Sequence, residues 1–295
     1  VAGTENIRTN TNATFLQNIN VGVAITAGKL GIGFTDSNVK IGNTALDSQT
    51  TGGNNVAVGN AALTANTGGS QNTAVGGEAL DANSTGNYNT AVGRNALGAN
   101  TTASSNSALG LSALAANTTG TQNTAVGAFA LDANTTADNN TAHGFSSLGA
   151  NTTGSNNTAV GASSLPVNTT AGNNTGIGFA SLLSNTTGAN NTAVGTYALD
   201  ANTTASYNSA FGYGALTGNT TGANNTALGY SSLQSNTTAD NNVAVGYYAL
   251  LLNTTGTQNT AVGNYALDAN TTASYNSAFG YGALTGNTTG ANNTA

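Results

Sequence analysis

One pattern of apolar, small and polar residues repeats from Asn38 to the last residue of the chain. The unit is N-x-A-[apolar]-G-x-x-[A/S]-L-x-x-N-T-T-[G/A]-x-x, and it recurs every 17 residues without an insertion. There are 15 complete units, and a sixteenth begins at Asn293. We number the positions of the unit from 1, which is always Asn, and position 5 is always Gly and position 9 always Leu. Such a period indicates stacked, nearly identical modules.

The length of the unit predicts an all-β fold, a parallel β-solenoid (β-roll) of 17-residue coils. A helix–turn–helix repeat needs about 34 residues. The Gly at position 5 and the N-T-T-G segment are turn residues, which leaves T-A-V and A-L as two short strands per coil. Since neighbouring coils lie about 4.8 Å apart, the array of residues 38–295 should form a rod roughly 70 Å long.

The alternation of a strand predicts which columns face the interior. Adjacent strand residues point to opposite faces, so we expect the apolar side chains at positions 4 and 9 to form two buried ridges. The small residues at positions 3 and 8 would then face outward, where close packing against another chain explains their size. This pattern predicts a bundle of parallel chains around a shared axis, with three chains as the favoured number.

Asparagine at position 12 has two interpretations. Thirteen of these residues lie in N-[S/T]-T sequons, and Asn83, Asn100, Asn117, Asn134 and Asn151 are the first five, so the chain could be a glycoprotein. Glycans on successive coils would be only about 4.8 Å apart, which is narrower than a sugar chain. A buried ladder in which each amide bonds the next is therefore preferred.

A second periodicity leaves the coil length open. Position 15 alternates between Gly and Ala from Gly86 to Gly290, and residues 198–227 recur identically at 266–295. Recent duplication of two-unit blocks explains this, and a 34-residue coil is the alternative reading of the same alternation.

The segment N-T-A-V-G-x-x-A-L resembles the head repeats of YadA-like trimeric autotransporter adhesins. With A-L-x-x-N-T-T-G it is more similar still to the NTAVG-repeat shafts of bacterial and phage surface fibres. The resemblance covers residues 38–295 and implies a left-handed β-roll, usually trimeric, on a cell or virion surface. The adhesin-head coil is shorter than this one.

Residues 1–37 do not follow the repeat. The alternation of apolar and small residues from Ile19 to Gly33 is typical of a strand. We expect this segment either to cap the first coil, whose open strand edge would invite polymerisation, or to pair with the preceding subunit. The second case would make the chain a self-polymerising filament subunit.

Charge and composition exclude several partners. Only 5% of residues are charged, the net charge is −6, and no Lys or Arg follows Arg94. A basic footprint for nucleic acid is therefore missing. No apolar run has the length of a membrane span, so we expect no membrane insertion in this segment. We expect an extracellular location, with copies of the chain itself as the main partners and surface glycans as an alternative partner.

Catalytic chemistry has few candidates in this sequence. His143 is the one histidine, there is no cysteine, and position 4 predicts that His143 is a tolerated core substitution. The Asp residues at position 10 lie on distant coils, which predicts solvated turn residues rather than a catalytic pair. The calcium pattern of β-rolls is missing. We therefore expect no enzyme activity, no cofactor and no metal.

Aromatic side chains gather at positions 6 and 7 in the second half of the array. An exposed aromatic stripe contacts partner chains or sugars, and we expect these contacts from Tyr213, Tyr230, Tyr247, Tyr248 and Tyr281.

Together the patterns predict a structural or adhesive fibre segment that forms a rigid rod. An ice-binding solenoid is a weaker alternative, because the paired Thr residues at positions 13 and 14 lie in a turn.

Overall fold

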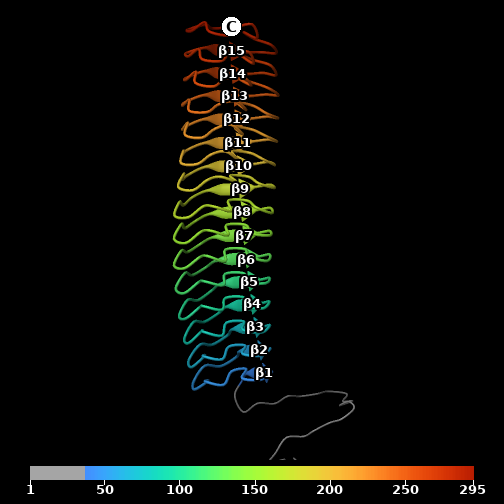
Figure 1. The fold of residues 1–295 in the computed structure, drawn as a ribbon, viewed down its shortest axis with the longest axis vertical. Coiled ribbons are helices and arrows are strands. Elements are labelled where there is room, and N and C mark those ends of the chain that lie inside the picture. The colour runs from blue at the N-terminus through green and yellow to red at the C-terminus, as the bar shows by residue number, and fades with distance from the viewer. Residues whose placement is uncertain (1–36) are drawn as a thin grey trace, which may run out of the picture. The chain divides into compact units, whose positions relative to one another are not determined.

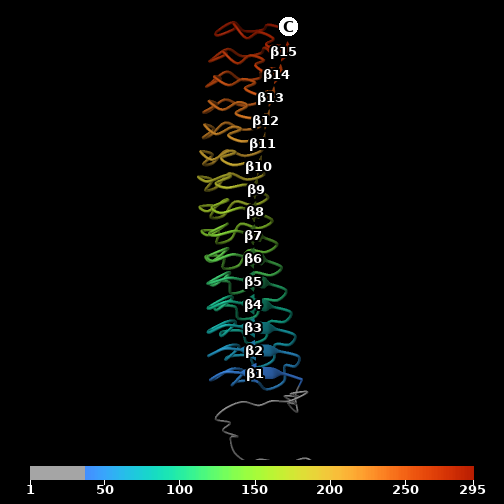
Figure 2. The same cartoon turned by 90° about the vertical axis from the view of Figure 1, so that its right-hand side faces the viewer.

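Positions 2 to 4 of every unit form a three-residue strand. The computed structural model describes residues 37–295, so the expectations for the N-terminal segment fall almost entirely outside the described residues. Within them the coils stack one above another along a single direction (Figure 1), and the view turned by 90° shows the same stack (Figure 2). The strands are β1 Val39–Ile41, β2 Val56–Val58, β3 Thr73–Val75, β4 Thr90–Val92, β5 Ser107–Leu109, β6 Thr124–Val126, β7 Thr141–His143, β8 Thr158–Val160, β9 Thr175–Ile177, β10 Thr192–Val194, β11 Ser209–Phe211, β12 Thr226–Leu228, β13 Val243–Val245, β14 Thr260–Val262 and β15 Ser277–Phe279.

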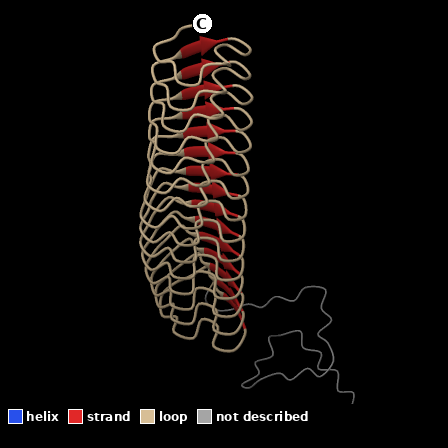
Figure 3. Ribbon diagram, turned by 45° about the horizontal axis from the view of Figure 1, so that its top comes forward, coloured by secondary structure: helices blue, strands red, loops and turns tan. Residues whose placement is uncertain are grey.

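All 15 strands pair in sequence order as one parallel sheet. The register advances by one unit at each step, so that Thr124 pairs with Thr141 and Ala125 with Ala142. One coil is therefore 17 residues long, and the 34-residue alternative is wrong. Figure 3 shows that the strands occupy one side of the stack and that turns complete each coil.

The A-L segment predicted as a second strand is instead part of a turn. Leucine at position 9 has a φ between +50° and +55° in every coil, as at Leu131 (φ +51°) and Leu216 (φ +55°). This left-handed conformation is incompatible with a strand. Each coil therefore has one strand, and turns form the rest of it. The left-handed backbone at position 9 directs the leucine side chain into the interior.

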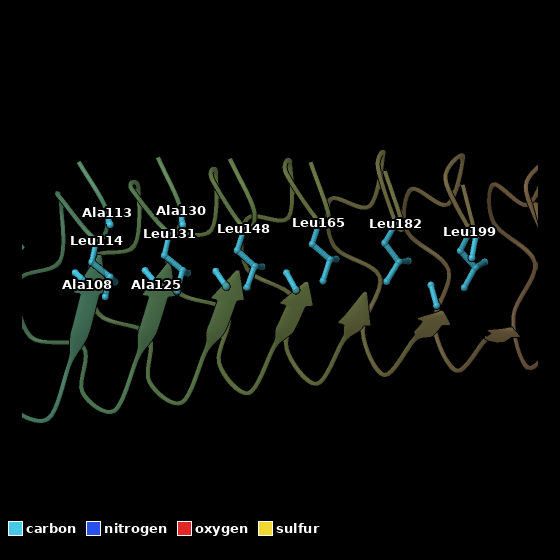
Figure 4. Packing of buried hydrophobic residues seen from close by; sticks show 14 of the residues in the cluster. Ala108, Ala113, Leu114, Ala125, Ala130, Leu131, Leu148, Leu165, Leu182 and Leu199 are labelled. Carbon is cyan, nitrogen blue, oxygen red and sulfur yellow. The ribbon is translucent and has the colours of Figure 1, made fainter. Parts of the chain in front are cut away.

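The interior is filled by positions 3, 8 and 9. The position 9 leucines lie in one buried ridge, as predicted, and Leu63, Leu80, Leu97, Leu114 and their successors to Leu250 are fully buried. Figure 4 shows the leucines from Leu114 to Leu199 projecting into the space between the strands and the opposite turns, beside alanines of positions 3 and 8.

The predicted orientation of the strand itself is wrong. Alanine at position 3 faces the interior and is fully buried in nearly every coil, as at Ala57, Ala125 and Ala193. The apolar residue at position 4 faces outward instead, and position 8 also lies inside. The inference that small columns require a neighbouring chain therefore loses its basis.

The narrowness of the coil explains why position 3 is small. At the one Gly in this column, Gly176, an added Cβ would lie 2.6 Å from Ser164 Oγ and 3.0 Å from Ser181 Oγ, both at position 8. Positions 3 and 8 thus touch across the coil, and the two hydroxyls, which lie 2.8 Å apart, take the space that a methyl group occupies elsewhere. The leucine supplies most of the remaining volume, so a position 3 residue larger than Ala does not fit in the coils after the first. In the first coil, β1 has an exposed Lys40 at this position.

Glycine at position 5 is required for two reasons. Its φ is between +128° and +143°, as at Gly161 (φ +128°) and Gly144 (φ +143°), a region that L side chains rarely adopt. At Gly195 a Cβ would also lie only 2.3 Å from the carbonyl oxygen of Gly212 in the next coil. Backbones approach each other at this corner more closely than any side chain permits.

Two asparagine ladders satisfy the polar interior. At position 12 each amide donates to the amide of the preceding coil, as in Asn134 Nδ2 to Asn117 Oδ1 at 2.8 Å. The same Nδ2 donates to the position 15 carbonyl of its own coil at 3.1 Å. At position 1 the side-chain oxygen accepts instead from the next coil's backbone, as in Asn140 N to Asn123 Oδ1 at 2.9 Å. The predicted amide ladder is confirmed at position 12, and position 1 forms a different one.

Candidate functional site

The outer side of the sheet carries a continuous apolar ridge formed by position 4. We call this surface the strand face and define it by positions 2 and 4 of β1 to β15. None of its position 4 side chains is buried, and Leu109 and Phe279 are 51% and 61% exposed. His143 lies in this ridge with an exposed side chain, so the prediction that it is a core substitution is wrong. The outward position also explains why Val, Ile, Leu, Phe and His are all accepted there.

Aromatic side chains form a second, separate column along one edge of the later coils. The aromatic column comprises Phe179, Tyr197, Tyr213, Tyr230, Tyr247, Tyr248, Tyr265 and Tyr281, and it includes all five tyrosines predicted as partner contacts. The rings of Tyr213 and Tyr230 stack with centroids 5.2 Å apart and planes 11° apart. Tyr230 and Tyr247 continue the stack at 5.4 Å. The column is contiguous because equivalent positions of successive coils lie directly above one another.

The centre of the column contains two tyrosines from the same coil. The ring centroids of Tyr247 and Tyr248 are 4.0 Å apart. A hydrogen bond with the Tyr248 side chain, with smaller effects from desolvation and from neighbouring tyrosines, raises the pKa of Tyr247 to about 12. The Tyr247 hydroxyl therefore keeps its proton to a higher pH than an ordinary tyrosine does.

The parallel stacking of rings within the column ends on one side of Tyr213. Tyr197 stands at 88° to Tyr213, with centroids 6.1 Å apart, so the parallel stack ends there. A cavity of about 280 Å³ opens at this point. We call it the Tyr197–Tyr213 pocket, and it is lined by Tyr197, Asp200, Tyr213, Gly214, Thr217, Ser231 and Gln234, which come from three successive coils.

Asp200 is the unusual member of this lining. Its Oδ1 atom is buried, and among residues 37–295 it is the one buried side-chain nitrogen or oxygen that has no hydrogen-bond partner. Burial raises the pKa of the Asp200 carboxyl, and two backbone hydrogen bonds oppose this shift. Thr217, which faces the pocket, donates its hydroxyl to the Tyr197 carbonyl at 3.1 Å and not to Asp200.

The other position 10 carboxylates lie on coils that are not neighbours of one another. Burial also raises the pKa of Asp81 and of Asp132, and both residues are partly buried. The prediction that these Asp residues are fully solvated is therefore wrong for Asp81 and Asp132, because the neighbouring coils partly cover position 10. The spacing in sequence did correctly place these groups on distant coils.

The position 12 sequons lie inside the folded coil. Asn83, Asn100, Asn117, Asn134 and Asn151 are completely buried. The Nδ2 atom of each donates to the amide of the preceding coil and to a position 15 carbonyl. The folded chain therefore offers no free amide for a glycan at these five positions.

Residues 37–295 contain neither a membrane-spanning helix nor a cluster of metal-ligating side chains. No helix in this part of the chain has the length and apolar character needed to cross a membrane. Here too, His, Asp and Glu side chains do not gather in any group of three that could hold a metal ion. Comparison of the chain with models of protein families, with curated proteins and with solved structures found no match in any of the three.

Proposed function

We propose that this chain is a structural and adhesive rod segment of an extracellular fibre on a cell or virion surface, and that it associates laterally with copies of itself. The observation that carries the proposal is the uninterrupted in-register stack of 15 strands with an apolar ridge along its outer face. The resemblance to NTAVG-repeat fibre shafts supports the same function and favours three chains.

Rigidity follows from how each coil is bound to its neighbours. Every step is joined by strand hydrogen bonds, by turn bonds such as Leu131 N to Ser147 O at 3.0 Å, and by both asparagine ladders. Opening one coil therefore breaks many bonds at once. A stack of this kind transmits force along its length and suits a spacer or shaft.

The strand face is the surface that we assign to lateral association. Exposed apolar patches that run along an entire molecule are rare in monomers. No Lys or Arg lies beyond Arg94, so the ridge of the later coils has no cation that would oppose a parallel copy. A second and a third copy, each contributing the same ridge, would cover it around a common axis.

The test separates the strand face from the rest of the rod. Val126→Lys, Val160→Lys and Val194→Lys, made together, place charges on the outer ridge of β6, β8 and β10, where they leave the core unchanged. We expect the parent chain to give a light-scattering mass of several chains and the triple variant a mass of one chain, with an unchanged circular dichroism spectrum. A parent mass of one chain at micromolar concentration would refute lateral association.

The matched control uses three exposed Thr residues at position 14. Thr119→Lys, Thr153→Lys and Thr187→Lys add the same charge away from the strand face, and we expect the association to persist. Negative-stain images of the parent chain should show rods. Globular particles would contradict the fibre function itself.

Two alternatives have distinct outcomes in these experiments. Joining end to end through residues 1–37 would give filaments far longer than one subunit, and deleting that segment would abolish them. One observation favours ice binding: the Thr residues at position 2 lie on the strand face, in T-x-V segments, and not in a turn. The ridge beside them varies from Val to Phe and is not flat, so we expect no thermal hysteresis.

A further inference from the structure

We propose that the Tyr197–Tyr213 pocket binds one pyranose ring of an uncharged hexose glycan. This inference rests on the proposed adhesive function and names the ligand class of one site on the rod. The ring would lie against the two tyrosines in the pocket that they line, and one of its hydroxyl groups would donate a hydrogen bond to Asp200.

The size and the walls of the pocket suit a sugar ring. Its volume of about 280 Å³ lies at the lower limit of small-molecule sites. Gly214 leaves the position 7 column empty between Tyr197 and Ser231, and this gap creates the pocket. The aromatic walls offer apolar area to the C–H face of a pyranose, while Thr217, Ser231 and Gln234 offer polar groups along the base.

The unpaired oxygen of Asp200 points to a missing donor. A buried acceptor without a partner is rare and costly, and it is usually satisfied by a ligand or by water. The identical block in the last coils shows the alternative arrangement, in which Thr285 donates to Asp268 Oδ1 at 2.6 Å. At the pocket Thr217 is turned to the Tyr197 carbonyl, so the Asp200 oxygen stays free for a hydroxyl group of a ligand.

Charge selects the class of glycan. An ionised carboxylate accepts hydrogen bonds and donates none, and sugar hydroxyls can donate them. The pocket has no cation in its lining, and the chain carries a net charge of −6. An acidic sugar would be repelled, so uronic and sialic acids are excluded by the same residue that would hold a neutral hexose.

The duplicated block repeats part of this site at a fixed distance. Residues 191–227 and 259–295 differ only at Thr196 and Asn264, so Tyr265, Asp268, Tyr281, Gly282 and Thr285 reproduce five members of the lining four coils further along. Successive sites would face the same side of the rod. A long glycan could therefore contact the rod at regular intervals, which raises its effective affinity.

The experiment measures binding of the full chain to two sets of soluble polysaccharides by affinity electrophoresis. The neutral set is hydroxyethylcellulose, dextran and galactomannan, and the acidic set is alginate and polygalacturonate. We expect retardation by at least one neutral polysaccharide and by neither acidic one. Every variant carries Tyr281→Ala, so that the second block does not contribute.

Three variants test the pocket in that background. Gly214→Tyr fills it with a residue that position 7 already accepts, since Tyr197 has a φ of +58° and Gly214 one of +63°. Asp200→Ala removes the acceptor. We expect each to raise the dissociation constant at least about tenfold, as the loss of a hydrogen bond to a charged group would. Tyr207→Ala removes an exposed tyrosine outside the pocket and should leave binding unchanged.

Three results would overturn the inference: no binding to any neutral polysaccharide of the set, equal binding by Gly214→Tyr, or tighter binding to the acidic set. Electron micrographs of the same samples keep the two proposals apart. Rods without glycan binding would overturn the pocket alone, and the absence of rods would overturn the fibre function.

Discussion

Leucine at position 9 is the residue on which the coil interior depends. It is the one large side chain that every coil places inside, between the small residues of positions 3 and 8. Its left-handed backbone is an unfavourable conformation for Leu, by roughly 1–2 kcal/mol for each residue. Burial of the side chain, worth about 1.5–3 kcal/mol, is large enough to offset that strain.

Leu131→Asp should disrupt the stack at its own coil and its two neighbours. Leu131 is fully buried, and an aspartate there would be an unpaired charge among alanines and leucines. We expect the free energy of unfolding, measured with denaturant, to fall by more than the ~2–5 kcal/mol typical of Leu→Ala. Leu252→Asp is the matched control, because Leu252 is 47% exposed at position 11, and it should change stability little. Equal effects of the two changes would contradict the interior assigned to position 9.

Asp132→Asn should stabilise the rod at neutral pH. Burial raises the pKa of Asp132 above its ordinary value of 3.8, so the folded chain binds this proton more tightly than the unfolded chain. Stability then falls as the pH rises from 3.8 through the raised pKa. The gain from the neutral amide, measured as a small rise in the melting temperature, should be present at pH 7 and vanish below pH 3.8.

The contrasting variant is Asp138→Asn. Asp138 Oδ1 accepts hydrogen bonds from Thr121 N at 2.6 Å and from Thr121 Oγ1 at 2.9 Å. Loss of the charge weakens these bonds, so this change should lower the melting temperature at pH 7. A gain from Asp132→Asn that persists unchanged at low pH would show that burial of the charge is not its cause.

At the scale of the element, the corner after each strand is the most tightly determined part of the coil. The strand ends at position 4, and the chain turns at once through the position 5 glycine, whose backbone touches the equivalent glycine of the next coil. The corner is therefore shared between neighbouring coils, which explains why no unit replaces this glycine.

Gly195→Ala should destabilise the rod by several kcal/mol. The methyl group would lie 2.3 Å from Gly212 O and 2.6 Å from Gly212 C, and the backbone φ of +140° is strained for alanine. Gly77→Ala is the matched control, since the nearest atom to its added Cβ is Asn60 O at 3.8 Å. Thermal melts of both variants test the argument, and a Gly195→Ala melting temperature equal to that of the parent would refute it.

The period, the leucine ridge and the position 12 ladder were predictable from the sequence, because each depends on a residue type that only one environment tolerates. The orientation of the strand was not predictable, because strand alternation alone does not say which of two adjacent columns faces the core. The more apolar column, position 4, was expected in the core, but position 3 is the buried one. Variation in size was the overlooked signal: position 4 accepts both Phe211 and His143, as only an outer surface can. The gap at Gly214 was visible in the sequence, but the unpaired oxygen of Asp200 depends on a rotamer of Thr217, and the walls of the Tyr197–Tyr213 pocket depend on ring orientations, neither of which any spacing encodes.

At the scale of the whole array, the coils of residues 37–295 form a one-dimensional stack in which each coil contacts only its neighbours. Stability is then a sum of coil and interface terms, so an interior coil is held on two sides. Local opening exposes a protease site only when a coil loses both interfaces. Residues 95–295 should therefore resist cleavage until the array itself is broken.

Proteinase K digestion of the native chain tests this property. Trypsin is uninformative, because no Lys or Arg follows Arg94. We expect one resistant fragment that contains residues 95–295, identified by mass spectrometry. In Leu131→Asp the loosened coil should be cut first, and two resistant fragments should replace the single one, since the coils on either side keep their own neighbours. Leu252→Asp should give the parental pattern. Rapid digestion of the parent under native conditions, or random cleavage in Leu131→Asp, would show that the coils do not hold one another as a stack.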